Sequence, residues 1–416
     1  MNTARPPLKT LDSALAELLA QALPLSEVDD LDTFEADGRV LARDLVSELN
    51  VPPRDNSAMD GYALRCADVA VAGTTLRVAQ RIAAGAVADQ ALASGEAARI
   101  FTGAQLPPGA DAVVMQEDCQ SLDDGSVRIN TVPVPGQNVR RAGEDVRLGA
   151  TVLPRGTRLN PAALGLAASI GLSRLPVARR PRVALFSTGD ELVMPGTVMP
   201  AQLPPGAIYN SNRFFLRALL QRLGCMVTDC GIVPDQRDAT LNALRQAAEG
   251  HDLILSSGGV SVGEEDHVKP AVQSLGSLDL WQVAIKPGKP FAYGKVRAGQ
   301  GQAHFIGLPG NPVSSYVTFL LLVRPFLLRL QGVPEPAVAP TMVTLPAHFE
   351  WARADKRREF LRARRNESGG VDLHPQQGSG VLTSVAWADG LVDNPPERRI
   401  AHGDPVRFIA FSEFMV

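Results

Sequence analysis

A loop rich in glycine and serine, residues 256–263 (SSGGVSVG), follows the apolar run 253–256 (LILS), which predicts a buried strand. Glycine lets a ligand approach the backbone closely, and successive backbone N–H groups can form a nest that binds an anion. We interpret this loop as a cradle for a phosphate or a pterin, the alternative being a flexible turn between a strand and a helix. The candidate binding residues in the loop are Ser257, Gly258, Gly259 and Ser261.

The same loop contains a second motif, because residues 259–263 (GVSVG) match the G-x-S-x-G nucleophile elbow of hydrolases. In that elbow a helix starts directly after the motif, whereas the acidic residues 264–266 prolong a polar loop here. A hydrolase would also need an aspartate and then a histidine later in the chain, and no motif marks either one. The sequence therefore disfavours a hydrolase.

Acidic residues recur directly after the first three predicted strands of the central region: Asp190, Glu191, Asp235 and Asp266. The carboxyl ends of parallel strands meet at one edge of a sheet, where several carboxylates suit a hard divalent cation that bridges phosphate oxygens. Taken singly, each carboxylate is an ordinary helix cap or a solvated loop residue. For Asp266 the role of N-cap competes directly with that of metal ligand.

Two further loops are suited to bind an oxyanion. Residues 286–290 (KPGKP) contain two lysines in a segment that its prolines stiffen, which lowers the entropic cost of holding both amines in place. Residues 308–312 (LPGNP) open a helix, whose free N–H groups and positive potential attract anions. The alternatives are a pair of solvated lysines and an ordinary loop before a helix. The candidate residues are Lys286, Lys289, Pro309, Asn311 and Pro312.

The elements that must position these loops alternate between strands and helices over residues 180–330. The pattern of apolar residues predicts strands at 182–187, 225–232, 253–256, 281–285, 291–296 and 304–307. It predicts helices at 212–223, 238–249, 267–275 and from Pro312 to about residue 330. Such alternation is typical of a mainly parallel α/β sheet with helices on both faces, which binds ligands beyond the carboxyl ends of its strands.

The regions on either side follow other patterns. Helices are predicted at 10–23 and at 161–170, the second of them capped by Asn160. A β-rich region between about 50 and 150 includes predicted strands at 75–82 and 126–132. After a proline-rich linker at 332–340, short strands at 341–345, 358–364 and 406–411 indicate a small β-barrel or sandwich. The length of 416 residues predicts about three domains.

Composition and charge exclude several classes of protein. The net charge of −3 leaves no basic footprint for nucleic acid or an anionic membrane, so an anionic ligand must be held by local cations. Four scattered cysteines form no disulfide framework, and no zinc motif is present. The apolar segment Gly307–Val323 is interrupted by prolines, and the N-terminus lacks the apolar core of a signal peptide. We expect a soluble, reduced, cytoplasmic protein.

Six motifs together resemble one family, the molybdopterin molybdenumtransferases, which include the C-terminal domain of gephyrin. They occur in order, and the similarity extends from about residue 10 to residue 412. The motifs are 57–62 (SAMDGY), 102–103 (TG) with 107–111 (PPGAD), 187–192 (STGDEL), 257–261 (SGGVS), 286–290 (KPGKP) and 307–314 (GLPGNPVS).

The resemblance implies a multidomain protein with a discontinuous first domain, 1–50 plus 141–177, and a β-rich domain inserted at 51–140. A central α/β domain at 178–330, similar to molybdopterin adenylyltransferases, and a C-terminal small β-barrel at 331–416 complete it. It also implies a homodimer whose composite active site lies between the α/β domain of one copy and the inserted domain of the other. The implied reaction inserts the substrate molybdate into adenylylated molybdopterin, with Mg²⁺-assisted release of AMP.

The resemblance also implies roles for individual residues. Those similar to molybdate or phosphate ligands are Lys286, Lys289, Arg357 and Ser379. Those similar to the set that cleaves the phosphoanhydride are Asp60, Thr102, Glu191, Asp235 and Asp266, of which the last three would hold Mg²⁺. Residues 356–360 (KRREF) lack the glycine that usually precedes the arginine, so either Arg357 or Arg358 could be the arginine that faces the site. The spacing to Phe360 favours Arg357. Ser384 likewise competes with Ser379.

Two other functions compete with this interpretation. A molybdopterin adenylyltransferase shares the α/β domain, but the domains on both sides of residues 178–330 are not needed for adenylylation in that related family. A non-enzymatic scaffold, as in gephyrin, is disfavoured because the motif residues are intact and no companion domain is present. A molybdopterin adenylyltransferase and apo-molybdoenzymes are the protein partners that the resemblance implies.

Overall fold

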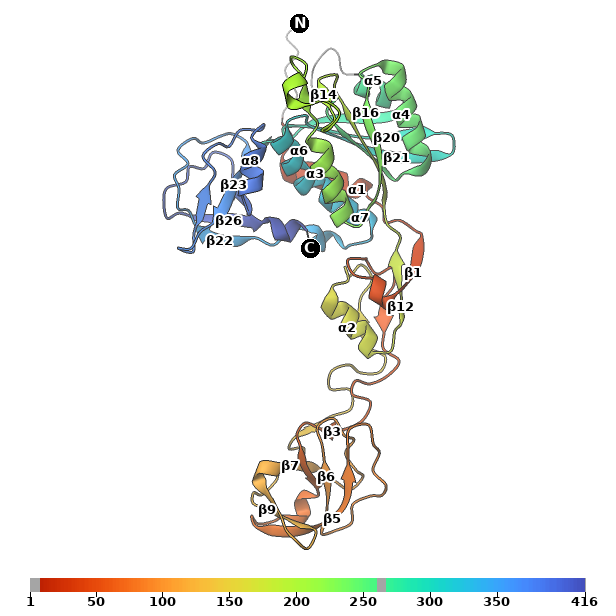
Figure 1. The fold of residues 1–416 in the computed structure, drawn as a ribbon, viewed down its shortest axis with the longest axis vertical. Coiled ribbons are helices and arrows are strands. Elements are labelled where there is room, and N and C mark those ends of the chain that lie inside the picture. Colours follow the sequence, from red (N-terminus) through yellow and green to blue (C-terminus); the bar gives the residue numbers. More distant parts are fainter. Residues whose placement is uncertain (1–7, 260–266, 416) are drawn as a thin grey trace.

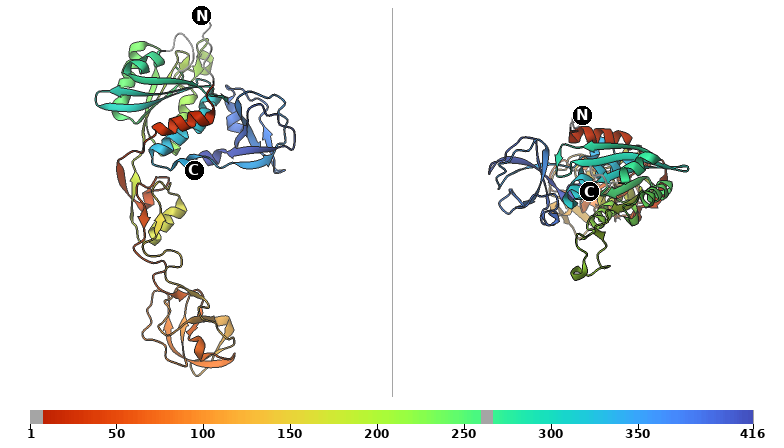
Figure 2. Two further views of the ribbon diagram at one scale, coloured as in Figure 1. Left: turned by 180° about the vertical axis from the view of Figure 1, so that it is seen from behind. Right: turned by 90° about the horizontal axis from the view of Figure 1, so that it is seen from above.

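The computed structural model describes residues 8–259 and 267–415 of the chain. Figure 1 shows an elongated molecule, with an α/β body and a C-terminal β body side by side at one end. A β-rich body lies at the opposite end, and a small unit that contains α2, β1 and β12 connects the two ends. The view from behind in Figure 2 shows the same arrangement.

The α/β body is built on a six-stranded sheet in the order β16-β13-β17-β21-β20-β18. The first four strands are parallel, and β20 and β18 run antiparallel to their neighbours. The carboxyl ends of β13, β17 and β21 therefore meet at one edge. The strands are β13 (Arg182–Thr188), β16 (Met226–Val233), β17 (Leu253–Ser257), β18 (Gly276–Gln282), β20 (Pro290–Ala298) and β21 (Gly301–Leu308).

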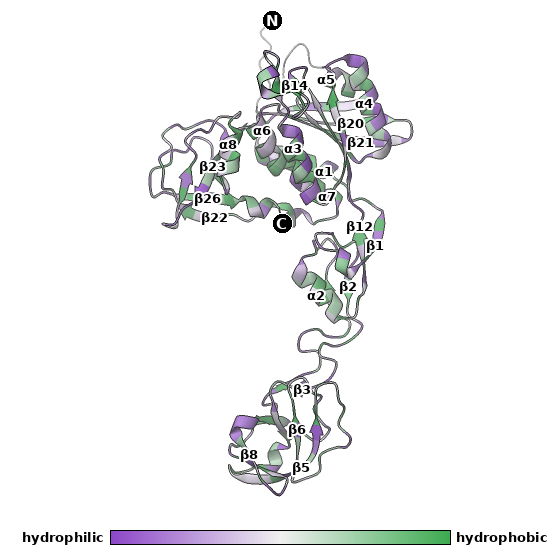
Figure 3. Cartoon of the chain, viewed as in Figure 1, coloured by the Kyte–Doolittle hydropathy of each residue, from purple (hydrophilic) through white to green (hydrophobic). Residues whose placement is uncertain are grey.

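Helices cover both faces of this sheet, because residues 183–188 of β13 are all buried and successive side chains point to opposite faces. Val183 and Leu185 pack in one core cluster with Leu216 of α3, whereas Phe186 packs in a second cluster with Leu244 of α4. The helices are α1 (Leu11–Gln21), α3 (Asn212–Arg222), α6 (Pro312–Thr318) and α7 (Arg324–Leu330) on the first side and α4 (Arg237–Gly250) and α5 (Val268–Leu275) on the second. Figure 3 shows hydrophilic and hydrophobic residues along α4 and α5, as expected for helices with one face on a sheet.

The residues from 312 to 330 form one helical run, in which the π-helical turn Phe319–Val323 joins α6 to α7. By length and composition alone, this run could cross a membrane. However, 83% of its most apolar window is buried inside the protein, as in the core helix of a globular domain. Its apolar residues are therefore explained by the core between the sheet and α1.

The connecting unit pairs segments that are far apart in the sequence. β1 (Val28–Asp32) is antiparallel to β12 (Arg174–Ala178), and β2 (Leu45–Val46) pairs with β11 (Thr151–Leu153). The helix α2 (Pro161–Ser169) packs beside them, and the Asn160 side chain accepts the N–H of Ala163 as its N-cap. The chain thus leaves this unit, forms the β-rich body and returns to it.

The β-rich body contains a six-stranded sheet in the order β7-β4-β6-β5-β9-β8. Its strands are β4 (Gly61–Leu64), β5 (Thr74–Ile82), β6 (Glu96–Ile100), β7 (Ala112–Met115), β8 (Cys119–Ser121) and β9 (Ser126–Ile129). A short pair, β3 (Asn56–Ser57) with β10 (Val139–Arg140), lies where the chain enters and leaves this body.

The C-terminal body is a sheet in the order β19-β23-β25-β26-β22, with β24 paired to β23. Its elements are β19 (Ile285–Lys286), β22 (Val343–Pro346), β23 (Arg358–Arg365), β24 (Val371–Leu373), β25 (Gly390–Asn394), β26 (Pro405–Ala410) and α8 (Leu382–Trp387). The strand predicted at 281–285 is therefore wrong as one element: β18 ends at Gln282, and β19 leaves the α/β sheet to run parallel to β23. The predicted closure of this body into a barrel stays a prediction.

Candidate active site

A cavity of about 680 Å³ lies beyond the carboxyl ends of β13, β17 and β21, at the edge where the sequence predicts a ligand site. Its walls come from the loops after these strands and after β16, from the start of α6, and from Gly380 of the C-terminal body. The predicted site residues that the structure brings together in its lining are Glu191, Asp235, Ser257, Gly258, Gly259, Pro309, Asn311 and Pro312. Ser261 and Asp266 lie outside the described residues.

Two buried polar side chains in the lining were missed by sequence reasoning. Thr188 is 5% exposed and Asn210 is 2% exposed, and neither Thr188 Oγ1 nor Asn210 Nδ2 has a hydrogen-bond partner among the described residues. Asn210 Oδ1 accepts a hydrogen bond from the backbone N–H of Arg213 at 3.2 Å, which fixes the orientation of the Asn210 amide. Because an unpaired buried polar atom is costly, both atoms are well suited to bond a ligand. Thr188 lies in the STGDEL motif, whereas no motif marks Asn210.

A third missed residue, Asn212, holds two loops of the cavity together. Its Nδ2 donates to Ser257 Oγ at 2.8 Å and to the Gly310 carbonyl at 2.7 Å. The first bond fixes the hydroxyl at the end of β17, and the second fixes the loop after β21. Because its amide nitrogen already makes these two hydrogen bonds, we assign Asn212 a positioning role rather than ligand contact.

The glycines after β17 let the backbone pass close to the end of β13. Gly258 has φ +94°, and a Cβ placed on it would lie 2.8 Å from the Thr188 carbonyl oxygen. Gly259 has φ +68°, and its Cβ would lie 2.5 Å from a methyl group of Val268. Any side chain at either position would be strained and would clash, so the open shape of this wall depends on glycine.

The two described carboxylates that were predicted to hold a metal both line the cavity. Glu191 is exposed and Asp235 is half-buried, and the Asp235 backbone N–H donates to Asp190 Oδ1 at 3.3 Å, which links their loops. Within residues 8–259 and 267–415 no group of three or more acidic, histidine or cysteine side chains could hold a metal ion. Two carboxylates beside a cavity still fit Mg²⁺, which commonly takes one or two protein carboxylates and completes its shell with phosphate and water.

Lys286 and Arg357 meet on one carboxylate, that of Asp355. Lys286 Nζ lies 3.3 Å from Asp355 Oδ2, and the Arg357 guanidinium donates to both oxygens of Asp355 at 2.9 and 3.0 Å. The Arg357 guanidinium holds the pKa of Asp355 well below its usual range. Lys286 Nζ also pairs at 2.9 Å with Glu359, which is 1% exposed. These two predicted oxyanion ligands are therefore neighbours.

Arg358 faces different neighbours from Arg357, because adjacent residues at a strand point to opposite sides. Its guanidinium donates to both oxygens of the buried Asp393 at 2.6 and 2.7 Å and to Asp12 of α1 at 3.1 Å. It thus ties the C-terminal body to α1, and Arg357 is the arginine beside Lys286.

Lys289 lies in a loop that is packed firmly against α6. Gly288 has φ +108°, and a Cβ placed on it would clash with Thr318 Oγ1, while the Lys289 carbonyl accepts the Val283 N–H at 2.8 Å. The Lys289 side chain is half-buried, and its ammonium has no ion pair in the part of the chain that the structure describes. The loop therefore presents an uncompensated positive charge from a fixed backbone.

The two candidate serines differ in their burial and in their distance along the chain from the cavity. Ser384 is fully buried; its hydroxyl donates to the Val381 carbonyl at 2.6 Å and accepts from Arg362 Nε at 3.2 Å. Ser379 is half-buried, and its carbonyl accepts the N–H of Val313 in α6 at 2.9 Å. The next residue along, Gly380, lines the cavity. The structure thus places Ser379 directly beside a residue that lines the cavity, whereas the Ser384 hydroxyl is buried and already partnered.

Asp60 and Thr102 meet each other in the β-rich body. The backbone N–H and the hydroxyl of Thr102 both donate to Asp60 Oδ1 at 2.8 Å. The backbone hydrogen bond from Thr102 is the main cause of a lowered pKa of Asp60. Within one chain, however, the β-rich body that carries this pair lies at the opposite end of the molecule from the α/β body that carries the cavity (Figure 1), so one copy does not bring the two sets together.

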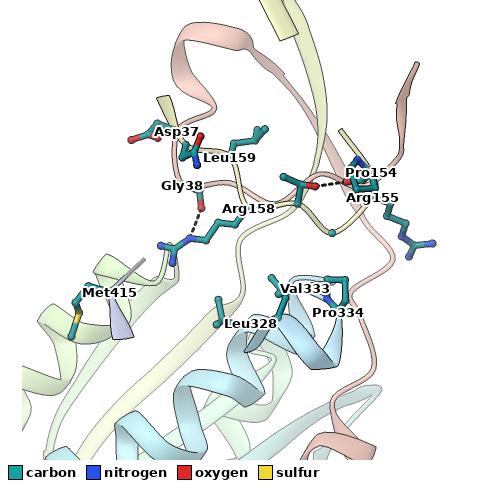
Figure 4. A pocket seen from close by; sticks show the side chains of 14 residues that line it. Asp37, Gly38, Pro154, Arg155, Arg158, Leu159, Leu328, Val333, Pro334 and Met415 are labelled. Atoms are coloured by element: carbon teal, nitrogen blue, oxygen red, sulfur yellow. Dashed lines mark hydrogen bonds between the residues drawn. The ribbon is translucent and has the colours of Figure 1, made fainter. Parts of the chain in front are cut away.

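A second cavity, of about 470 Å³, lies at the junction between the connecting unit and the α/β body (Figure 4). Asp37 and Arg158 line one side, and Leu328, Val333 and Met415 line the other. It contains none of the predicted site residues, so it is separate from the candidate site.

Three family models match successive parts of the chain. The MoeA N-terminal region, domains I and II, matches residues 9–171, and the MoeA C-terminal region, domain IV, matches residues 344–411. A probable molybdopterin binding domain matches residues 184–329 between them.

Whole-length relatives agree with these matches. A molybdopterin molybdenumtransferase from Haemophilus influenzae is 39% identical over 98% of this chain and 99% of its own length. A molybdopterin molybdenumtransferase 2 from Mycobacterium tuberculosis is 38% identical over 92% and 94% of the two chains. The crystal structure of a molybdopterin biosynthesis MoeA protein from Pyrococcus horikoshii superposes with a TM-score of 0.77 at 31% identity, covering 97% of this chain and 99% of that one. The chain therefore belongs to the molybdopterin molybdenumtransferase family, as its motifs predict.

Proposed function

We propose that this chain inserts molybdate into adenylylated molybdopterin and releases AMP, in an active site that two copies of the chain share. Its membership of the family makes it a molybdopterin molybdenumtransferase of molybdenum cofactor biosynthesis. The observation that carries the finer proposal is the cavity at the sheet edge, which combines two carboxylates with unpartnered buried donors. Such a cavity suits a large polar anion better than an apolar ligand.

The pterin and its phosphates would occupy this cavity. Backbone N–H groups of the loop after β17 and the free donors Thr188 Oγ1 and Asn210 Nδ2 can bind phosphate and pterin oxygens there. Asn212 keeps the Ser257 hydroxyl in place, and Pro309, Asn311 and Pro312 form the opposite wall. In this arrangement the protein supplies oriented donors before the substrate arrives, which lowers the cost of binding.

Molybdate, the second substrate, would bind at the cationic cluster of Lys286, Lys289 and Arg357, with Ser379 nearby. A tetrahedral dianion needs local cations in a protein of net negative charge. Lys286 and Arg357 are balanced by Asp355 and Glu359, so Lys289, which has no ion pair among the described residues, supplies the uncompensated charge. Asp355 orients Arg357 and Lys286 toward each other, so a dianion would meet a fixed pair of charges. The dithiolene sulfurs of molybdopterin would then displace molybdate oxygen, which leaves as water with the protons of the two thiols.

Glu191 and Asp235 would hold Mg²⁺, together with Asp266, which lies outside the described residues. When bound, the ion would neutralise charge on the phosphate oxygens during cleavage of the phosphoanhydride.

A second copy of the chain would supply Asp60 and Thr102, so the proposal includes a homodimer with a composite site. Their separation from the cavity within one chain is the reason for this assignment. We also propose the domain boundaries given above, which the pairing of β1 with β12 across the insertion supports. The same proposal includes a cytoplasmic location. It also includes receipt of adenylylated molybdopterin from an adenylyltransferase and delivery of the finished cofactor to apo-molybdoenzymes.

The decisive assay mixes the purified protein with adenylylated molybdopterin, Mg²⁺ and molybdate and measures the release of AMP. We expect AMP release that depends on molybdate and needs no ATP. A reaction that consumes ATP and adenylylates molybdopterin would instead indicate the adenylyltransferase alternative. AMP release no higher than that of buffer would contradict the proposed function.

A further inference from the structure

Two arginines of the β-rich body lie at matching positions on neighbouring strands. In the parallel pair β5–β6, Arg81 is in register with Arg99. Elsewhere in the same pair Arg77 is in register with Glu96 and forms an ion pair with it. Like charges side by side on neighbouring strands repel each other. Arg77 is neutralised by Glu96, whereas Arg81 and Arg99 need another source of compensation.

The compensation that the structure describes comes from aromatic rings and neutral acceptors. The Arg81 and Arg99 guanidinium carbons lie 4.5 and 4.7 Å from the ring centroid of Phe101. Arg99 also donates to the Gly61 carbonyl at 2.9 Å and to Gln116 Oε1 at 2.6 Å. Among residues 8–259 and 267–415 neither guanidinium forms an ion pair with a carboxylate. A cation–π contact offsets only part of the repulsion, so both charges can still accept an anion.

This pair of arginines flanks the Asp60–Thr102 hydrogen bonds. Phe101 directly precedes Thr102, and Gly61, whose carbonyl binds Arg99, directly follows Asp60. The Arg99 charge contributes to the lowered pKa of Asp60. The two cations therefore stand at the same end of the sheet as the residues that we assign to phosphoanhydride cleavage.

We propose that Arg81 and Arg99 bind a phosphate group of the adenylylated substrate beside Asp60 and Thr102. The inference rests on the proposed function, in which this end of the β-rich body faces the cavity of the second copy. A guanidinium presents a planar fork of donors that matches a phosphate. Arg81 is exposed, and its guanidinium has no hydrogen-bond partner in the described part of the chain. Phe101 holds both forks in place before the phosphate arrives, so little side-chain freedom is lost on binding.

The competing explanation gives Arg81 a structural role only, in which it covers the ring of Phe101. The two explanations differ in what a substitution changes. A covering role predicts a loss of thermal stability with unchanged substrate affinity, whereas phosphate binding predicts weaker affinity with little change in stability. Arg81 is the better test residue, because Arg99 also braces the backbone next to Asp60.

The experiment compares wild type with Arg81→Gln, and Arg128→Gln serves as a matched control. Arg128 is exposed on β9 of the same sheet, and its guanidinium bonds only Gln120 among the described residues. We expect Arg81→Gln to raise the KM for adenylylated molybdopterin about tenfold to a hundredfold, the range of a charge-assisted phosphate contact. The molybdate concentration for half-maximal AMP release and the melting temperature should stay at wild-type values, as should every property of Arg128→Gln.

Titration calorimetry with pyrophosphate, which carries the same phosphoanhydride group, supplies a readout that needs no turnover. We expect wild type and Arg128→Gln to bind pyrophosphate with equal affinity and Arg81→Gln to bind it about tenfold more weakly. Equal pyrophosphate affinity of wild type and Arg81→Gln would overturn the inference, as would an unchanged KM. If the wild-type protein binds pyrophosphate through Arg81 but releases no AMP, the proposed function is contradicted, whereas phosphate binding at Arg81 remains supported.

Discussion

Thr102 donates two hydrogen bonds to one oxygen of Asp60: its backbone nitrogen and its hydroxyl oxygen each lie 2.8 Å from Asp60 Oδ1. The antiparallel pairing of β4 with β6 places Gly61 opposite Ile100, so the residues just outside the two strand ends meet. The second carboxylate oxygen of Asp60 accepts no hydrogen bond within the described residues. Asp60 is thus held in one orientation with an oxygen left for a ligand.

Replacing Thr102 by valine removes the hydroxyl and keeps the shape and the backbone N–H. Hydrogen bonds to the ionised form lower the pKa of Asp60, so the variant should raise this pKa toward the ordinary value of about 3.9. Because the ionised form is the one that Thr102 stabilises, the acidic limb of the rate profile should move to higher pH. We expect kcat to fall about tenfold, the effect of one charge-assisted hydrogen bond.

A pH titration of the Asp60 carboxyl carbon by NMR, together with kcat against pH, measures both effects. Thr102→Ser retains the hydroxyl and serves as the control, with values near wild type. An unchanged pKa of Asp60 in Thr102→Val would show that the hydroxyl bond does not form in solution.

Asp355 joins the two cations of the proposed molybdate site, so Asp355→Asn should destabilise the protein in a pH-dependent way. The pKa of Asp355 is lowered in the folded state, chiefly by Arg357. Its stabilising contribution is therefore complete above the unfolded value of about 3.9 and declines as pH falls toward the folded value. We expect a loss of about 1 kcal/mol at pH 7, discounted for a side chain that is 22% exposed, and a smaller loss at pH 3.

Urea unfolding followed by tryptophan fluorescence at the two pH values measures this difference. Glu350→Gln, an exposed change in the same body, should have no effect at either pH. A loss that is as large at pH 3 as at pH 7 would mean that the charge of Asp355 is not what stabilises the site.

Lys289→Ala should raise the molybdate concentration needed for half-maximal AMP release about tenfold to a hundredfold. A lysine–oxyanion contact contributes about 1.5–3 kcal/mol, and the fixed loop supplies the charge without a competing partner in the described residues. Stability should change by less than about 0.5 kcal/mol, because the half-buried Lys289 has no ion pair among the described residues to lose. Lys289→Arg should rescue binding only in part, because a planar fork places its donors differently from a point charge.

Lys295→Ala, on the strand β20 that follows the Lys289 loop, is the matched control for a general loss of positive charge. A molybdate titration at fixed pterin concentration distinguishes the variants. A Lys289→Ala curve that superposes on the wild-type curve would show that Lys289 does not bind molybdate and is an ordinary solvated lysine.

Local signals predicted most elements of the α/β body. The predicted strand 182–187 is β13 to within one residue, and Asn160 caps α2 as predicted, because both depend on apolar periodicity and capping chemistry over a few residues. The split at residues 281–285 was not predictable in this way. An apolar run does not say which sheet will accept it, and β19 gains its partner from β23, about 70 residues later in the chain.

The candidate site shows the same division. Glu191, Asp235 and the glycines after β17 were predicted together, because the ends of parallel strands must meet at one edge. Asn210 and Asn212 were missed, since a lone asparagine in a loop carries no signal until its burial and partners are known. The contact of Asp60 with Thr102 likewise depends on the register of β4 and β6, and the arginine pair beside it depends on the register of β5 and β6.

The central claim, a composite site completed by a second copy, is tested most directly by mixing two inactive variants. Asp60→Ala lacks a residue of the β-rich body, and Glu191→Ala lacks a residue of the cavity, so each homodimer should release AMP at background rate. In a mixed dimer one of the two sites carries both changes and the other carries neither, which predicts about half of the wild-type rate per dimer for a twofold-symmetric composite site. Mixed dimers that stay as inactive as either parent would contradict the shared site.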